Sequence, residues 1–250
     1  MEMVLLTALG VGLATVFGAV IGFSFRKISH TFSDIILSFA AGIMLAAAVI
    51  GLILPAVEYG GKNGLVITVI GVFAGALCLN VFDKFVPHLH RLVGAESEEH
   101  NNENLNKVLL FVFAIGLHNL PEGIAAGVGF GAGDTSKALM IAGGIALQNI
   151  PEGMVIIAPM LAAGVSPKKT FICALLTGAV EVVGTLLGYF AVSVSTAILP
   201  FALAFAGGTM LYVISDEMIP ETHAHGHQRG ATYALLVGFC VMLISDVLLG

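Results

Sequence analysis

Apolar runs of about twenty residues recur along the whole chain, and they constrain its fold more than any other feature. A helix of about 20 apolar residues crosses roughly 30 Å of hydrocarbon, so each run is long enough for one membrane span. Only 10% of the 250 residues are charged and 58% are hydrophobic, whereas soluble domains carry about 25% charged residues. The pattern predicts an all-α membrane protein and excludes a soluble fold.

Polar breaks divide the chain into eight candidate spans within a single transmembrane domain, 1–250. With both termini outside, eight of the ten Lys and Arg residues fall in cytoplasmic loops, and only Lys62 and Lys137 lie on the outer side. The positive-inside rule therefore predicts eight helices with both ends outside and a long cytoplasmic loop at 84–107. The predicted spans are residues 4–25, 35–55, 64–83, 108–129, 138–160, 170–190, 196–217 and 231–249.

The net charge of −6 comes without a basic patch that could follow a phosphate backbone. We therefore expect no nucleic-acid partner, and membrane lipid around the spans.

Two similar polar segments interrupt the fourth and fifth spans. LHNLPEG occupies 117–123 and LQNIPEG occupies 147–153, a spacing of thirty residues. Each places a glutamate, Glu122 or Glu152, near the middle of a span, where a carboxylate costs about 2.5 to 3.5 kcal/mol to insert. The alternative interpretation is that proline-kinked helices bury amides and a protonated glutamate in a packing network. Two copies of the segment favour a functional site. A third acid, Glu181 in the sixth span, is as compatible with packing as with ligation.

Helical spacing puts the polar residues of each segment on one face. Pro121 and Pro151 are expected to kink the two helices and to free the carbonyls of Leu117 and Leu147, at a depth where carriers keep their ion sites. The candidate ligands are His118, Asn119 and Glu122 in the fourth span and Gln148, Asn149 and Glu152 in the fifth.

An imidazole, carboxylates and amide oxygens without a thiolate suit a borderline divalent cation such as Zn²⁺, Fe²⁺ or Mn²⁺, and not Cu(I). Clustered carboxylates repel one another and should share protons until a cation displaces them. The sequence therefore predicts a central metal site between the fourth and fifth helices.

At these residues the chain resembles the ZIP family of metal transporters, whose fourth and fifth helices carry HNxPEG and (H/Q)(N/D)xPEG. The likeness extends over nearly the whole chain: eight spans, a variable His-containing loop after the third, a glutamate in the sixth, and Ser215-Asp216-Glu217 with Pro220-Glu221 closing the seventh. The resemblance implies a binuclear site between the fourth, fifth and sixth helices. Its primary ligands would be His118, Glu122, Gln148 and Glu152, and its second position Asn119, Asn149 and Glu181, with Glu122 and Glu152 helping to bridge.

The resemblance also implies uptake of divalent metal into the cytoplasm across the plasma (inner) membrane, a homodimer, and an elevator-like motion of the central helices. The chain departs from the family pattern at two positions. Asn149 stands where some members carry Asp, which should weaken or retune the second position, and Gly51 stands where many members have a His before the Leu-Pro pair, which puts a His-based gate in doubt.

We therefore expect a secondary transporter of zinc, or of Fe, Mn, Cd or Co, with metal as substrate and no organic cofactor. An intramembrane metal-dependent hydrolase and a metal sensor without flux are the alternatives. The hydrolase is disfavoured because HExxH and GxSxG are missing, so no enzyme activity is expected. A second group, read either as a metal-release site or as an ordinary solvated helix end, comprises Asp216, Glu217, His223 and His225.

Overall fold

The computed structural model describes residues 1–24, 29–92, 116, 119–131, 133 and 135–249. These residues form helices and connecting turns, without a strand among them. Residues 119–131 are helical. The other elements are α1 (Glu2–Ser24), α2 (His30–Ala46), η1 (Ala47–Ile53), α3 (Leu54–Tyr59), η2 (Gly61–Asn63), α4 (Gly64–Leu92), α6 (Thr135–Ala162), α7 (Pro167–Val194), η3 (Thr196–Ile198), α8 (Leu199–Val213), η4 (Ile214–Met218), α9 (Ile219–Thr222) and α10 (Gln228–Leu249).

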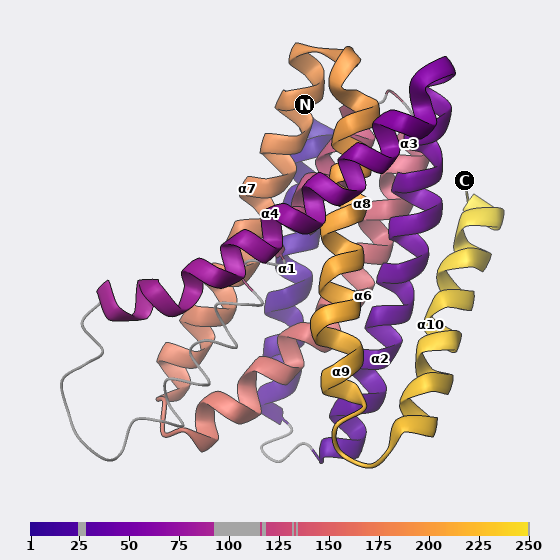
Figure 1. Ribbon diagram of the computed structural model, residues 1–250. Coiled ribbons are helices and arrows are strands. Elements are labelled where there is room, and N and C mark those ends of the chain that lie inside the picture. Colours follow the sequence, from indigo (N-terminus) through magenta and orange to yellow (C-terminus); the bar gives the residue numbers. More distant parts are fainter. Residues whose placement is uncertain (25–28, 93–115, 117–118, 132, 134, 250) are drawn as a thin grey trace.

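Seven helical runs in the described part of the chain are long and apolar enough to cross a membrane. Segment 119–131 covers the second half of the predicted fourth span, of which residues 108–115, 117 and 118 lie outside the described residues. Helix α1 begins and α10 ends at the same end of the bundle (Figure 1). The chain is thus an all-α, multi-pass membrane protein. Helix α4 continues to Leu92, past the predicted end of its span, and residues 93–107 of the predicted loop lie outside the described residues.

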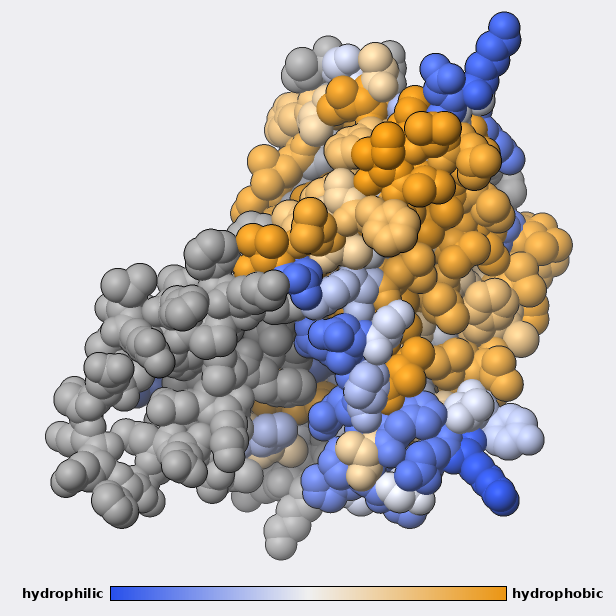
Figure 2. All heavy atoms as spheres, viewed as in Figure 1, coloured by the Kyte–Doolittle hydropathy of each residue, from blue (hydrophilic) through white to orange (hydrophobic). Residues whose placement is uncertain are grey.

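The packing of α1 is typical of a helix that faces lipid. Its buried side is built of small residues such as Ala8, Gly12 and Gly18, whereas Leu13 and Phe17 are exposed. Small inward residues let helix backbones approach closely, and the large apolar residues lose nothing by facing lipid tails. Figure 2 shows the same outcome over α4, α8 and α10, where a broad hydrophobic band separates hydrophilic ends.

Two spans contain a short π-helical segment that ends two residues before a proline. Segment η1 precedes Pro55, and η4 precedes Pro220. In each the last wide turn closes with a backbone bond to a carbonyl five residues earlier, from Leu54 N–H to Val49 and from Ile219 N–H to Ile214. The runs α2–η1–α3 and α8–η4–α9 therefore remain single membrane-crossing units, each with a local irregularity of a kind that is frequent at functional sites.

Glycines divide the described helices into two bundles. A Cβ added at Gly12, Gly18 or Gly153 would collide with backbone atoms across α1, α6 and α7, and one added at Gly123 would collide with the backbone of Glu181. Backbone contacts of the same kind join α2 to α10 and α4 to α8. The two glycines that face the other bundle, Gly51 and Gly144, meet side chains only: Ile141, Met242 and Ile43.

We call α1, segment 119–131, α6 and α7 the site bundle, and the remaining described helices the frame. Backbone interlocking holds each bundle together internally, whereas flexible side chains fill the boundary between them. The apolar core at this boundary combines residues of both bundles, such as Met44 and Met242 of the frame with Ile141 and Ile145 of the site bundle.

Candidate metal centre

Three close helix contacts position the candidate ligands. Segment 119–131 packs on α7, where the amide of Asn119 donates to the carbonyl of Thr177 at 3.2 Å and Gly123 lies against the backbone of Glu181. Helix α1 packs on both α6 and α7. These contacts bring Glu122, Glu152 and Glu181, which come from three helices, into one buried region.

The three carboxylates are deeply buried and act on one another electrostatically. Glu122 and Glu181 are 0% exposed and Glu152 is 7% exposed. The negative charges of Glu152 and Glu181 both act on the carboxylate of Glu122, and the side chain of Gln148 lies beside it. Three like charges held together in a low-dielectric region repel one another strongly unless protons or a cation neutralise them.

Several buried polar atoms at this place have no hydrogen-bond partner among the described residues. They are both carboxylate oxygens of Glu122, both amide atoms of Gln148, and the amide oxygens of Asn119 and Asn149. An unpartnered buried acceptor is costly, and natural structures keep few of them. Five such oxygens come from two helices, segment 119–131 and α6. Carboxylate and amide oxygens are typical cation ligands, so this group is a candidate cation site.

Glu181 has a different environment from Glu122. Its Oε2 accepts from the hydroxyl of Thr15 at 3.1 Å and its Oε1 accepts from the amide of Asn149 at 2.5 Å. The same amide also donates to the carbonyl of Val11 at 3.3 Å. Thr15 was not among the residues that sequence reasoning selected. Its signal is a polar residue between Gly12 and Gly18, three positions from each, and it is the one polar side chain among the residues that α1 buries.

The structure thus brings together Asn119, Glu122, Gln148, Asn149, Glu152 and Glu181 in the site bundle. His118 lies outside the described residues. In the part of the chain that the structure describes, no three His, Cys, Asp or Glu side chains alone are arranged to hold a metal. The amide oxygens are therefore needed to complete any ligand set. Helix α6 is continuous through Pro151 and Pro159, and the predicted kinks remain predictions.

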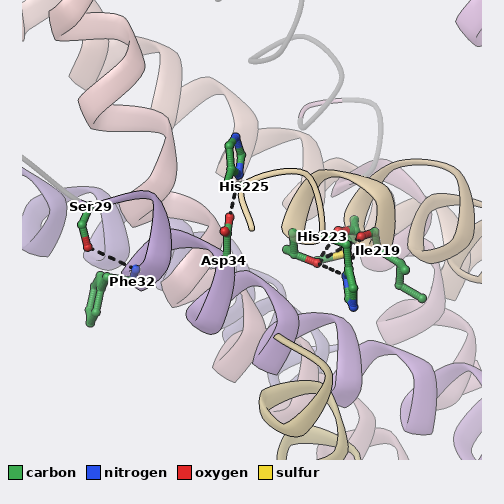
Figure 3. A network of polar contacts seen from close by, with 8 residues as sticks. Ser29, Phe32, Asp34, Ile219, His223 and His225 are labelled. Atoms are coloured by element: carbon green, nitrogen blue, oxygen red, sulfur yellow. Dashed lines mark hydrogen bonds and ion pairs between the residues drawn. The ribbon is translucent and has the colours of Figure 1, made fainter. Parts of the chain in front are cut away.

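Two residues of the second predicted group, His223 and His225, lie at the turn between α9 and α10 (Figure 3). His223 Nδ1 lies 2.9 Å from the carbonyl oxygen of Ile219, so this ring interacts with the backbone of the preceding helical turn. His225 Nδ1 lies 3.0 Å from Oδ1 of Asp34, a buried acid of α2 that sequence reasoning did not select, and its ring stacks on His30. Asp216 and Glu217 lie in η4. The two histidines thus have separate partners and do not form a cluster with each other.

Comparison with known proteins shows which family the chain belongs to. The family model described as ZIP Zinc transporter matches residues 94–246. The chain belongs to the ZIP family. It is 44% identical over 205 residues to the zinc transporter GufA of Myxococcus xanthus, covering 80% of each chain. It is 37% identical to the zinc transporter ZIPB of Bordetella bronchiseptica, covering 95% of this chain and 78% of the relative. It is 34% identical to the zinc transporter ZupT of Chlorobaculum parvum, covering 95% and 94%.

Membership of the ZIP family confirms the predicted class, a metal transporter and not an enzyme. The hydrolase alternative is thereby removed. The roles of the individual residues are the subject of the proposals below.

Proposed function

We propose that this ZIP protein carries a divalent transition metal, zinc foremost, into the cytoplasm across the plasma membrane through the site bundle. The observation that carries the proposal is a group of buried oxygens, on Asn119, Glu122, Gln148 and Asn149, that have no hydrogen-bond partner in the described part of the chain. Buried acceptors with no donor are stabilised by a cation. The relatives named zinc transporters support zinc as that cation.

The ligand set divides into two positions. Glu122, Gln148 and Glu152, with His118, are the primary ligands, and Asn119, Asn149 and Glu181 form the second position that Glu122 and Glu152 help to bridge. One cation beside Glu122 relieves the repulsion among three acids, and the protons that they share without metal leave as it binds. The mixed nitrogen and oxygen donors favour a borderline divalent metal.

The boundary between the bundles gives the metal a route past the frame. Because backbone interlocking holds the site bundle together, it can shift as one body, whereas the side chains of Ile43, Ile141 and Met242 can repack as it slides. An elevator-like motion of the site bundle against the frame would expose the acids to one side of the membrane and then to the other. The frame, with its extensive lipid-facing surface, is the part that we propose forms a homodimer.

Reconstitution in liposomes tests the proposal. The purified protein is expected to admit zinc with saturable kinetics, to take Fe²⁺, Mn²⁺, Cd²⁺ or Co²⁺ in competition, and to leave Cu(I) outside. Uptake is followed with a metal-sensitive dye inside the vesicles, with protein-free vesicles as the control. High-affinity zinc binding without any zinc flux would contradict transport and favour a sensor.

The inner group is tested by replacing Asp216, Glu217, His223 and His225 together with Asn, Gln and two Ala residues. If these side chains accept metal at the inner mouth, the maximal rate of uptake should fall several-fold while the outside KM stays nearly constant, because release and not capture is slowed. Initial rates over a range of outside zinc concentrations give both quantities. An unchanged maximal rate together with unchanged zinc affinity at the cytoplasmic face would assign the group to an ordinary solvated helix end.

A further inference from the structure

Glu181 and Glu122 occupy one site but have opposite hydrogen-bonding states. Both oxygens of Glu181 accept hydrogen bonds, from Thr15 at 3.1 Å and from Asn149 at 2.5 Å. Both oxygens of Glu122 lack a partner among the described residues. Each carboxylate oxygen has two lone pairs, so these bonds do not exclude a metal ion. They do fix the position of the Glu181 carboxylate, which must break at least one of them in order to move toward a metal ion.

The backbone packing of α1 holds Thr15 in place. Gly153 of α6 lies directly against the carbonyl oxygen of Thr15, and Gly12, one turn earlier, lies against the backbone of Gly178. Thr15 itself is fully buried. Contacts on both sides therefore leave the hydroxyl little freedom to follow Glu181 if that carboxylate moves toward a metal.

Asn149 completes the arrangement because it has an N–H where an aspartate would have an oxygen. Its amide group donates both to Glu181 and to the carbonyl of Val11, so it ties the acid of α7 to the backbone of α1. Its own oxygen has no hydrogen-bond partner among the residues that the structure describes and can face a cation. An aspartate at 149 would repel Glu181 and leave it free, whereas the asparagine holds it.

We propose that Thr15 is a positioning residue that keeps Glu181 in reserve. The metal binds first with Glu122, Gln148 and Glu152, and Glu181 joins the ligand set only when it leaves the Thr15 hydroxyl. The inference rests on the proposed transport function. Helix α1 then contributes to the metal site through a residue that does not bind the metal. Binding at the second position depends on the release of Glu181 from the Thr15 hydroxyl. The competition between hydroxyl and metal keeps binding weak enough for release.

Replacement of Thr15 by valine removes the hydroxyl and keeps the shape of the side chain. Because Glu181 then loses one of its two donors, it is a more available ligand, and zinc should bind about tenfold more tightly, the equivalent of one hydrogen bond to a charged group. Tighter binding also slows release, so the KM and the maximal rate of uptake should fall together. A merely structural role for Thr15 would weaken binding and raise the KM.

Zinc affinity is measured in detergent, and the KM and maximal rate are measured from zinc flux in liposomes. Both experiments are done at pH 8 to limit competition from protons. Thr15→Ser keeps the hydroxyl and should stay closer to the wild type than Thr15→Val in both. In a Glu181→Gln background, Thr15→Val should change zinc affinity less than twofold, because the side chain through which it acts has lost its charge. The thermal midpoint of each variant shows that it is folded.

Weaker zinc binding in a folded Thr15→Val protein, or an equal effect of Thr15→Val with Glu181 and with Gln at that position, would overturn the role of Thr15. Failure of the proposed function gives a different result in the same assay, because the wild type would then show no zinc flux, or zinc flux would survive in Glu122→Ala. The ratio of the zinc affinity of Thr15→Val to that of the wild type tests the role of Thr15, and zinc flux in Glu122→Ala tests transport separately.

Discussion

Zinc flux is expected to fall at least about 100-fold when Glu122 is replaced by alanine. Changing a residue that only supports a metal ligand costs about 10- to 100-fold, and Glu122 is proposed as a ligand itself. Initial zinc uptake into liposomes, at equal protein density, measures the loss. Glu2→Gln is the matched control, because it removes a carboxylate that is exposed in the first turn of α1 and should transport as the wild type does.

The stability of a Glu122 variant should change in the opposite direction from its activity. Glu122→Gln keeps the size of the side chain but removes a buried carboxyl group that has no hydrogen-bond partner among the described residues and that is repelled by two other acids whenever it ionises. Loss of that repulsion should stabilise the metal-free protein by about 1 to 3 kcal/mol, seen as a higher thermal midpoint in the presence of a chelator. Zinc should raise the midpoint of the wild type and not that of the variant. If Glu122 serves only to pack the helices, Glu122→Gln will melt lower and still transport.

Gly153→Ala is expected to destabilise the protein by about 1 to 3 kcal/mol, although it adds a single methyl group. That methyl group would collide with the carbonyl oxygen and backbone of Thr15 and with the nitrogen of Ala19, which cannot rotate away as a side chain can. Helix α1 must then separate from α6, and the hydrogen bond from Thr15 to Glu181 should be lost with it. The midpoint of thermal unfolding in detergent, together with zinc flux, measures both effects.

The same substitution at Gly143 is the control for Gly153→Ala. Gly143 lies on the same helix, is exposed, and has open space where the Cβ would stand. Alanine there should be neutral or stabilise α6 by about 1 kcal/mol, because glycine is the poorer helix former. Equal midpoints for the two variants would show that the α1 and α6 backbones are not in close contact.

The spans of this protein could be predicted from local sequence because the cost of placing a side chain in hydrocarbon is a property of that side chain. The same reasoning selected Glu122 and Glu152, which stand in two similar segments where an acid is expensive, and comparison with known proteins confirmed the family. The limits of individual helices were less predictable. Helix α4 continues to Leu92 beyond its apolar run, since a helix that leaves the membrane can continue in water.

The pairs of side chains across the helices depended on tertiary structure. Thr15 meets Glu181 across 166 positions of sequence, and Asp34 meets His225 across 191. Hydropathy says that Thr15 is a tolerable residue in a membrane and nothing about which helix it faces. Its partner is decided by the glycines that let α1 approach α6 and α7, and these contacts exist only once the helices have packed.

The sequence by itself therefore determined that the chain crosses a membrane as a set of helices and that acids lie within it, because burial cost is local and additive along the chain. Only the tertiary structure decided which acid is left open and which is held. Hydrogen bonds between helices depend on distances of a few ångströms that packing sets, and residues far apart in the sequence supply both partners.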